Sequence, residues 1–320
     1  MFGLTFLSAT SKTTTHRVVP FRIKRLGGVA GYVAGGSNSG GRISGIDKVS
    51  FPADTKTTLS ATLTSGRDGV SGFANSSVAG YAAGGYDGAR VSGIDKVSFP
   101  TDTKTTLSAT LTTARDGLAG FANSGTAGYA AGGYDGNYIS GIDKVSFPLD
   151  TKTTLSATLT TGRTTVTGFA NSGTAGYVAG GDSSGGTISG IDKVSFSADT
   201  KTTLSATLTT ARFITAGFAN SGVAGYVAGG LDSARISGID KVSFPADSKT
   251  TLSATLTTAR EGGAGFANSG VASYVAGGSD GTNISGIDKV SFPADSKTTL
   301  SATLTSGRGY AAGFADSGTL

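Results

Sequence analysis

The chain contains no cysteine and no tryptophan, and its 320 residues include one methionine and one histidine, His16. Without cysteine there can be no disulfide framework, thiolate metal site or thiol nucleophile. One imidazole leaves little material for a histidine zinc site or a serine–histidine–aspartate triad. We therefore expect no metal site, no cofactor and no enzymatic activity.

Long apolar segments are also missing. No apolar run approaches the roughly 18 residues needed to span a bilayer, so we expect no membrane span. The opening Met1–Leu7 lacks the basic region and the long apolar region of a cleaved signal peptide.

Charged residues make up only 15% of the chain, and they are unevenly placed. Residues 1–28 hold five of the 26 cations and no acid, whereas the remaining 21 cations match 21 acids in residues 29–320. Glu261 is the only glutamate, so the acidic charge is almost entirely aspartate, which suits turns better than helix surfaces. This contrast predicts a basic N-terminal arm, 1–28, followed by a neutral body, 29–320.

The body is a sixfold internal repeat. The phrase Ile-Ser-Gly-Ile-Asp-Lys-Val-Ser-Phe, once with Val in place of the first Ile, recurs every 48 or 49 residues. Its aspartates are Asp47, Asp95, Asp143, Asp192, Asp240 and Asp288. Each copy is followed by a Thr/Ser-rich stretch that ends in Arg and by a Gly-Phe-Ala-Asn phrase or a close variant, and a phrase of the Gly-Tyr-Val-Ala-Gly-Gly type precedes each copy.

Each unit contains four short segments with strand character. In the second unit they cover 80–83, 91–99, 105–112 and 118–122, where apolar and polar residues alternate or β-branched residues prevail. Glycine, proline, aspartate and asparagine separate them, and no segment keeps a helical period. Four strands in about 48 residues are typical of a propeller blade.

We therefore predict an all-β fold, a six-bladed β-propeller of four-stranded antiparallel blades. The chain starts on a Gly-Gly strand and ends on a Gly-Phe strand, so the terminal strands should share one blade and close the ring. Deleting residues 310–320 should then lower the melting temperature sharply. Glycine should allow close approach around a narrow channel, with the Gly-Gly pairs supplying positive φ. The core between the blades is expected from Tyr32, Ile46, Val49, Phe51, Leu59, Leu63, Phe73 and their equivalents.

These phrases resemble the kelch repeat. The resemblance covers residues 30–320 and rests on the strand ending in Gly-Gly, the Ile-Asp-x-Val-x-Phe strand, Asp-Thr-x-x-x-Leu, the Arg at the strand end and Gly-Phe. Leucine replaces the aromatic residue usual in the fourth strand of kelch repeats, at Leu59, Leu107, Leu155, Leu204, Leu252 and Leu300. The repeated formula is also similar to repeat proteins of tailed phages and some bacteria. A kelch enzyme resembling galactose oxidase would need histidine ligands and a cysteine-modified tyrosine, which this composition cannot supply.

The repeated acids favour structural roles. Asp47 and its copies are expected to pair with Lys48, or with Arg67 in the equivalent repeat, and Asp54-Thr55-Lys56 is expected to be a solvated hairpin tip. Equivalent carboxylates on separate blades lie too far apart for one ion. Identical repeats also give identical environments, so nothing singles out a catalytic acid.

Two windows differ between the repeats, namely the turn after Gly-Gly and the link after Arg. In an up-and-down blade both lie at the same end, and loops on a rigid scaffold commonly carry recognition. The hypothesis is a binding face for protein or glycan. It contains Arg42, Tyr86, Asp87, Arg90, Tyr134, Asp135, Tyr138, Phe213, Arg235 and Tyr310. Neutral drift of unselected turn tips would give the same variation.

The basic arm mixes apolar residues with its cations. We expect it to anchor the protein on other structural proteins, with a frayed terminus as the alternative. The expected anchoring residues are Arg17, Phe21, Arg22, Lys24 and Arg25. Five charges without a recognisable motif do not favour nucleic acid.

Two function classes follow. The first is a non-enzymatic structural or attachment protein of a phage virion or an extracellular assembly. The second is a free lectin-like or protein-binding propeller in a bacterial cell, so a cytoplasmic location stays open. The phage resemblance favours the first.

Overall fold

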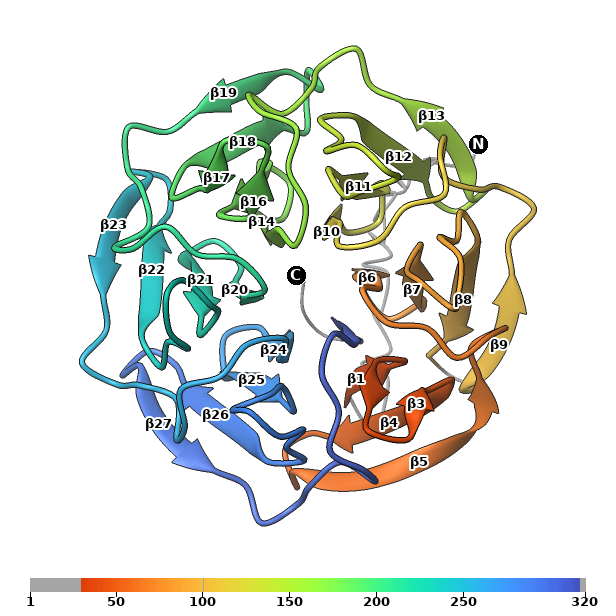
Figure 1. The fold of residues 1–320 in the computed structure, drawn as a ribbon, viewed down its shortest axis with the longest axis vertical. Helices are drawn as coiled ribbons and strands as arrows, with labels where there is room; N and C mark the ends of the chain where they lie inside the picture. The colour runs from red at the N-terminus through yellow and green to blue at the C-terminus, as the bar shows by residue number, and fades with distance from the viewer. Residues whose placement is uncertain (1–29, 100, 317–320) are drawn as a thin grey trace, which may run out of the picture.

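Six four-stranded antiparallel sheets surround a common axis in the computed structural model, which describes residues 30–99 and 101–316 (Figure 1). Each sheet stands like a blade, with its innermost strand at the axis and its last strand at the rim. The described residues contain strands and turns and no helix. The predicted six-bladed β-propeller is confirmed.

The strands are given from the axis outward. The first blade contains β28 (Ala312–Ala315), β1 (Ala30–Ala34), β4 (Gly45–Ser50) and β5 (Thr55–Thr62). The second contains β6 (Ser71–Asn75), β7 (Ala79–Ala83), β8 (Ile94–Ser98) and β9 (Thr103–Thr106). The third contains β10 (Ala119–Asn123), β11 (Ala127–Ala131), β12 (Ile142–Ser146) and β13 (Thr151–Thr154). The fourth contains β14 (Thr167–Asn171), β15 (Ala175–Ala179), β18 (Ile191–Ser195) and β19 (Lys201–Thr203).

The fifth blade contains β20 (Ala216–Asn220), β21 (Ala224–Ala228), β22 (Ile239–Ser243) and β23 (Ser248–Thr251). The sixth contains β24 (Ala264–Asn268), β25 (Ala272–Ala276), β26 (Ile287–Ser291) and β27 (Ser296–Thr299). Two further hairpins, β2 (Ser37–Asn38) with β3 (Gly41–Arg42) and β16 (Asp182–Ser183) with β17 (Gly186–Thr187), extend the turn between the second and third strands of their blades.

Burial explains the residue pattern of the strands. Second strands such as β7 are buried at every position, because a blade packs against a neighbour on each face. The outer strand β9 is mostly exposed, and this accounts for its threonines. The expected core residues are buried except Leu59 and its equivalents and Phe292, which are partly buried at the edge of the core.

Aromatic rings fill the space between blades. Phe73 of β6 stacks on Tyr81 of β7 with ring centroids 5.1 Å apart, and Tyr81 stacks on Phe147 of the next blade at 5.1 Å. A Cβ at Gly128 would overlap the ring of Phe73, so this glycine allows the ring to lie against β11. Blade-to-blade packing therefore depends on small residues beside large ones.

The two ends of the described chain share one sheet. β28 pairs with β1 in register from Gly31 opposite Ala315 to Ala34 opposite Ala312. The C-terminal strand thus supplies the inner strand of the first blade, and the predicted ring closure is confirmed.

Two details of the prediction are corrected. The Gly-Gly pairs have positive φ, 65° at Gly84 and 106° at Gly85, but they follow the second strand instead of lining the channel. The closest approach at the axis occurs at the glycine of each inner strand, where a Cβ at Gly120 would overlap the carbonyl oxygen of Gly72. The outer strand was expected over 105–112 in the second blade and covers 103–106.

The N-terminal arm, 1–28, with Arg17, Phe21, Arg22, Lys24 and Arg25, lies outside the described residues. The described residues include no helix that is long and apolar enough to cross a membrane.

Candidate recognition face

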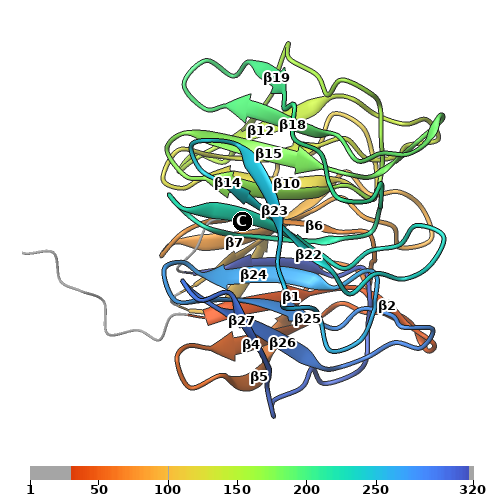
Figure 2. The same ribbon diagram turned by 90° about the vertical axis from the view of Figure 1, so that its left-hand side faces the viewer.

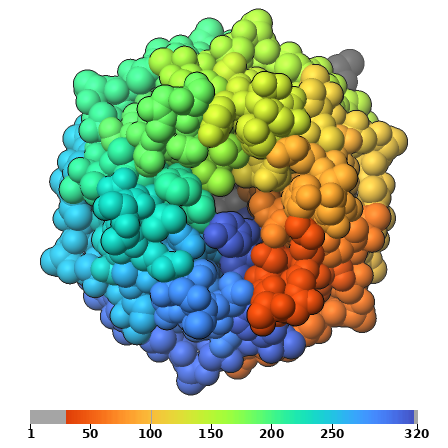
Figure 3. All heavy atoms as spheres, in the orientation of Figure 1, coloured from red at the N-terminus to blue at the C-terminus, as the bar shows by residue number. Residues whose placement is uncertain are grey.

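The two variable windows lie side by side at one end of the propeller. The backbone N–H of Asp68, in the link, donates to the carbonyl of Tyr86, in the turn, at 3.1 Å, and the reverse bond measures 2.8 Å. An equivalent backbone bridge occurs in all six blades. This face carries β2 on the right of Figure 2 and is turned to the viewer in Figure 1 and Figure 3.

Arg and Tyr side chains form a ladder across the first three blades of this face. The Arg42 guanidinium lies 4.4 Å from the centroid of the Tyr86 ring, and its Nε lies 3.5 Å from Asp68. One blade further on, Arg90 lies 4.5 Å from the centroid of the Tyr134 ring. Each arginine therefore reaches from the end of its own turn to the next blade.

The ladder continues into the fourth blade. The Tyr134 and Tyr138 rings are tilted, with centroids 5.3 Å apart, and the Tyr138 hydroxyl donates to Asp182 at 3.1 Å. That hydrogen bond raises the pKa of the Tyr138 phenol above its ordinary value. Tyr86, Tyr134 and Tyr138 are all half-buried, so part of each ring faces solvent.

The aspartates next to the ladder tyrosines hold the turns in shape. Asp87 accepts hydrogen bonds from the Ser65 hydroxyl at 2.9 Å and from the backbone N–H of Ala89 at 3.3 Å, and these two bonds lower its pKa. Asp135 accepts from the backbone N–H of Asn137 at 3.0 Å. Both carboxylates are acceptors bound to their own loops.

A second, smaller cluster lies across the fifth and sixth blades. Arg235 is 3.3 Å from Glu261, and the Tyr310 hydroxyl donates to the same carboxylate oxygen at 3.4 Å. Burial first, and then the Glu261 charge, raise the pKa of Tyr310. Phe213 belongs to neither cluster. Its backbone N–H and C=O pair with Leu231.

The structure thus joins five of the ten expected residues in the ladder and two in the second cluster, while Asp87 and Asp135 bind groups of the neighbouring loops. Sequence reasoning missed their acidic partners Asp68, Asp116 and Glu261, although a signal for them exists. Wherever the turn ends in arginine, the following link begins with an acid, and Arg90 accordingly pairs with Asp116 at 3.0 Å. When two positions change together from one repeat to the next in this way, we infer that their side chains are in contact.

Backbone strain marks the mouth of the channel on this face. Thr165, Ile214 and Tyr310 have φ values of 51°, 56° and 61°, in the left-handed region. The equivalent positions of the other three blades are glycine, at Gly69, Gly117 and Gly262. A β-branched or aromatic residue there costs about 1–3 kcal/mol. The three side chains help to line a cavity of ≈ 90 Å³ at the mouth, where Figure 3 shows a central hollow.

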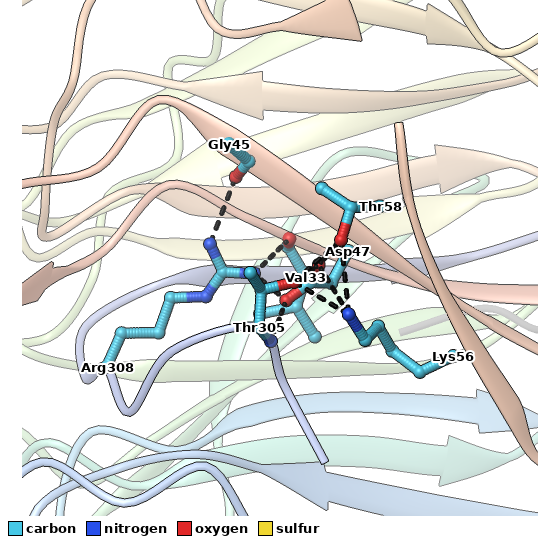
Figure 4. A network of polar contacts seen from close by, with 7 residues as sticks. All are labelled: Val33, Gly45, Asp47, Lys56, Thr58, Thr305 and Arg308. Carbon is cyan, nitrogen blue, oxygen red and sulfur yellow. Dashed lines mark hydrogen bonds and ion pairs between the residues drawn. The ribbon is translucent and has the colours of Figure 1, made fainter. Parts of the chain in front are cut away.

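Buried ion pairs hold the scaffold beneath the face (Figure 4). Asp47, on β4, accepts from Arg308 at 2.7 Å, from the Thr58 hydroxyl at 2.7 Å and from the Thr305 backbone N–H at 2.9 Å. Arg308 and Thr305 end the sixth blade, so the network joins the last unit to the first. The other pairs are Arg67–Asp95, Arg115–Asp143, Arg163–Asp192, Arg212–Asp240 and Arg260–Asp288.

The pKa values of five of these buried carboxylates, Asp47, Asp95, Asp143, Asp240 and Asp288, are lowered, which favours their ionised form. Burial raises the pKa of Asp95, but hydrogen bonds from Thr64 and Thr106 and the charge of Arg67 outweigh it, so the pKa falls below its ordinary value. The predicted ion pair with arginine is therefore confirmed, and the partner comes from the preceding unit. The alternative partner Lys48 is wrong.

Lys48 instead meets the turn of the next blade. It donates to Asp102 at 2.7 Å, and the Tyr32 hydroxyl donates to the other oxygen of Asp102 at 2.9 Å. Asp54, the equivalent of Asp102 in the first blade, accepts from Tyr274 and Lys289 of the sixth. The expected hairpin tip is confirmed, with Thr55 exposed, but its aspartate is not a free solvated group, because it binds side chains of the neighbouring blade.

No group of three or more histidine, aspartate or glutamate side chains among the described residues is placed to hold a metal ion. The fold defines the class of the protein, a six-bladed β-propeller with one variable loop face. No model of a known protein family matches the chain, and no match was found among curated proteins.

Proposed function

We propose that this propeller is a non-enzymatic structural or attachment protein of a virion or an extracellular assembly. Its variable face binds a protein or a glycan, and its basic arm anchors it to other structural proteins. The repeat phrases alone support two parts of this proposal, that the propeller is of the kelch type and that it comes from a phage or a similar assembly.

The distribution of differences between the repeats carries the proposal. The scaffold residues of the ion-pair network recur unchanged in all six units, whereas the turns at Tyr86, Tyr134 and Leu231 differ from one blade to the next. The divergent residues include half-exposed tyrosines and arginines, which are the usual anchors of protein interfaces and suit sugar rings as well. A rigid ring with one differentiated face fits recognition.

The roles of the acidic groups support a non-enzymatic function. Asp47 and Asp95 each bind an arginine and two threonines, and the same environment recurs in the other blades. A pair of catalytic carboxylates needs different environments to separate an acid from a base. The sixfold repeat gives each Asp the same structural task.

The test replaces the three tyrosines of the ladder. Tyr86→Ala, Tyr134→Ala and Tyr138→Ala together should lower affinity for a partner found by glycan array or by pull-down at least about tenfold, since each buried ring at a hot spot contributes about 1–2 kcal/mol. The matched control replaces the same residues by Phe, which keeps the rings. Undiminished binding by the triple Ala variant removes this face as the binding site.

A second candidate function is a free lectin-like or protein-binding propeller in a bacterial cell, which the same tyrosines favour. Mass spectrometry of purified particles separates the two. Detection of the chain in particles supports the structural role. A soluble monomer with sugar affinity, and no particle association, supports the alternative.

A further inference from the structure

The sequence of the outer rim is nearly the same in all six blades, whereas the sequence of the loop face differs from blade to blade. The nine residues Lys-Thr-Thr-Leu-Ser-Ala-Thr-Leu-Thr are identical in all six units, at 56–64, 104–112, 152–160, 201–209, 249–257 and 297–305. Turns on the loop face diverged while this segment did not. Part of the identity is explained by packing, because Leu111 is buried and Thr106 and Thr112 bind buried aspartates.

Three exposed positions of the segment have no such explanation. In the second blade they are Thr105, Ser108 and Thr110, and their hydroxyls make no recorded hydrogen bond within the part of the chain that the structure describes. Exposed residues that neither pack nor bind within the fold drift freely in other parts of this chain. Their identity in six copies indicates contact with something outside the blade.

The strand that begins this segment presents an open sheet edge beside these positions. β9 is the last strand of its sheet, and Leu107 donates its N–H inward to Ile94 at 2.9 Å. Because alternate residues of a strand direct their N–H and C=O to the same side, Lys104 and Thr106 of β9 direct theirs outward, and Ser108 follows just beyond the end of the strand. Figure 1 shows these outer strands following the rim.

Two of the usual protections of such an edge are missing, although the strand itself is short. Natural edge strands place lysine side chains outward or contain proline. Here Lys104 turns inward, 3.6 Å from Asp95, and donates to Thr64 and Thr106 at 2.9 and 3.0 Å. None of the six nine-residue segments contains proline.

Each edge borders a groove between two blades. One groove of ≈ 600 Å³ lies between Thr58–Thr62 and the turn at 101–104, and two equivalents measure ≈ 620 and ≈ 440 Å³. The groove walls hold hydroxyls, alanine and leucine, together with Lys104 and with the carboxylate of Asp102, which Lys48 binds. Such a groove suits an extended segment that carries apolar residues.

We propose that these rim grooves bind the N-terminal arm of a second copy of the chain as an added β-strand. The segment 18–24, Val-Val-Pro-Phe-Arg-Ile-Lys, supplies apolar side chains for the leucine and alanine of the groove. Twenty-nine residues precede Ala30, and an extended chain of that length reaches about 100 Å, far enough to reach a neighbouring propeller. The inference rests on the anchoring role of the arm in the proposed function and assigns its receptor.

The test compares the oligomeric state of full-length variants by light scattering. The rim variant carries lysine in place of the exposed serine of each segment, at Ser60, Ser108, Ser156, Ser205, Ser253 and Ser301. The control variant carries six lysines at exposed turn positions of the loop face, at Ser39, Ala89, Asn137, Ser184, Ala234 and Thr282. The wild type and the control should assemble, and the rim variant should remain monomeric.

A competition experiment uses unaltered protein. A synthetic peptide of residues 15–27 in excess should dissociate the wild-type assembly, and the same peptide with N-methylated backbone should need at least about ten times the concentration, because strand addition depends on main-chain hydrogen bonds. A monomeric wild type, an assembling rim variant or equal potency of the two peptides would overturn the proposal. Binding by the tyrosine ladder is measured independently, so this failure is distinct from failure of the proposed function.

Discussion

Single buried residues hold the blades together through charge. Arg67 and Asp95 are each at most 2% exposed, and Asp95 also accepts from Thr64 of the preceding blade. A buried pair is weak evidence of net stability, but removal of one partner leaves an uncompensated charge. The loss of an aspartate should therefore destabilise the protein mainly because it leaves a buried arginine charge unpaired, and less because the ion pair itself adds stability.

Asp95→Asn should destabilise the protein by about 3–5 kcal/mol, because Arg67 would be left buried without a counter-charge. Urea unfolding measures the change. Asp232→Asn is the control, since Asp232 is an exposed turn aspartate, and its effect should stay within about 0.5 kcal/mol. Equal effects of the two substitutions would contradict the role given to the ion pair.

The same carboxylates predict acid sensitivity. The pKa values of Asp47, Asp95, Asp143, Asp240 and Asp288 are lowered from the ordinary 3.8, so the folded state binds fewer protons than the unfolded state. Stability should be fully present above about pH 5 and should fall as the pH drops through 3.8 towards the folded-state pKa values. Unfolding free energy measured against pH should show this slope, and Asp95→Asn should make it shallower. A flat profile between pH 5 and pH 3 contradicts the assignment.

At the scale of strands, closeness to the axis sets the sequence. Each inner strand places a glycine against the carbonyl of the preceding blade, as Gly120 does against Gly72 and Gly168 against Gly120. Alanine at such a position has no space to occupy. The inner strands can therefore vary in their loops but not at this glycine.

Gly120→Ala should lower the free energy of unfolding by about 1–3 kcal/mol or more, because the added methyl group would meet the Gly72 carbonyl. Thermal unfolding followed by circular dichroism measures it. Gly286→Ala provides the control, since no atom lies within 4 Å of a Cβ built there. A neutral Gly120→Ala would mean that the channel is wider than described.

The strands also show what can and cannot be predicted from the sequence. The alternation of apolar and polar residues, together with the glycines between segments, predicts the inner three strands of each blade, because these patterns reflect burial and turn geometry within one unit. The outer strand of the second blade ends early, at Thr106, since Asp95 holds that threonine and, after Leu107, the next inward backbone bond comes only at Leu111. The pairing of Lys48 with Asp102 depends on which turn the neighbouring blade presents, and no local pattern contains that information.

At the scale of the molecule, the ring is closed by a strand that comes last in the chain. Phe314 of β28 is fully buried and stacks on Tyr32 of β1 with centroids 5.5 Å apart, while Arg308 reaches Asp47 across the same seam. The first blade would have an open inner edge without this strand. The scaffold of the loop face and the rim therefore depends on a contact between residues nearly 300 positions apart.

The most direct test of this account is truncation at the seam. Deletion of residues 310–320 removes β28 and should lower the melting temperature by at least about 10 °C, because burial of one phenylalanine alone is worth about 3–5 kcal/mol. A chain that ends at Asp316 keeps β28 and should melt close to the full-length protein. An unchanged melting temperature after deletion of 310–320 would contradict a propeller closed by its two ends.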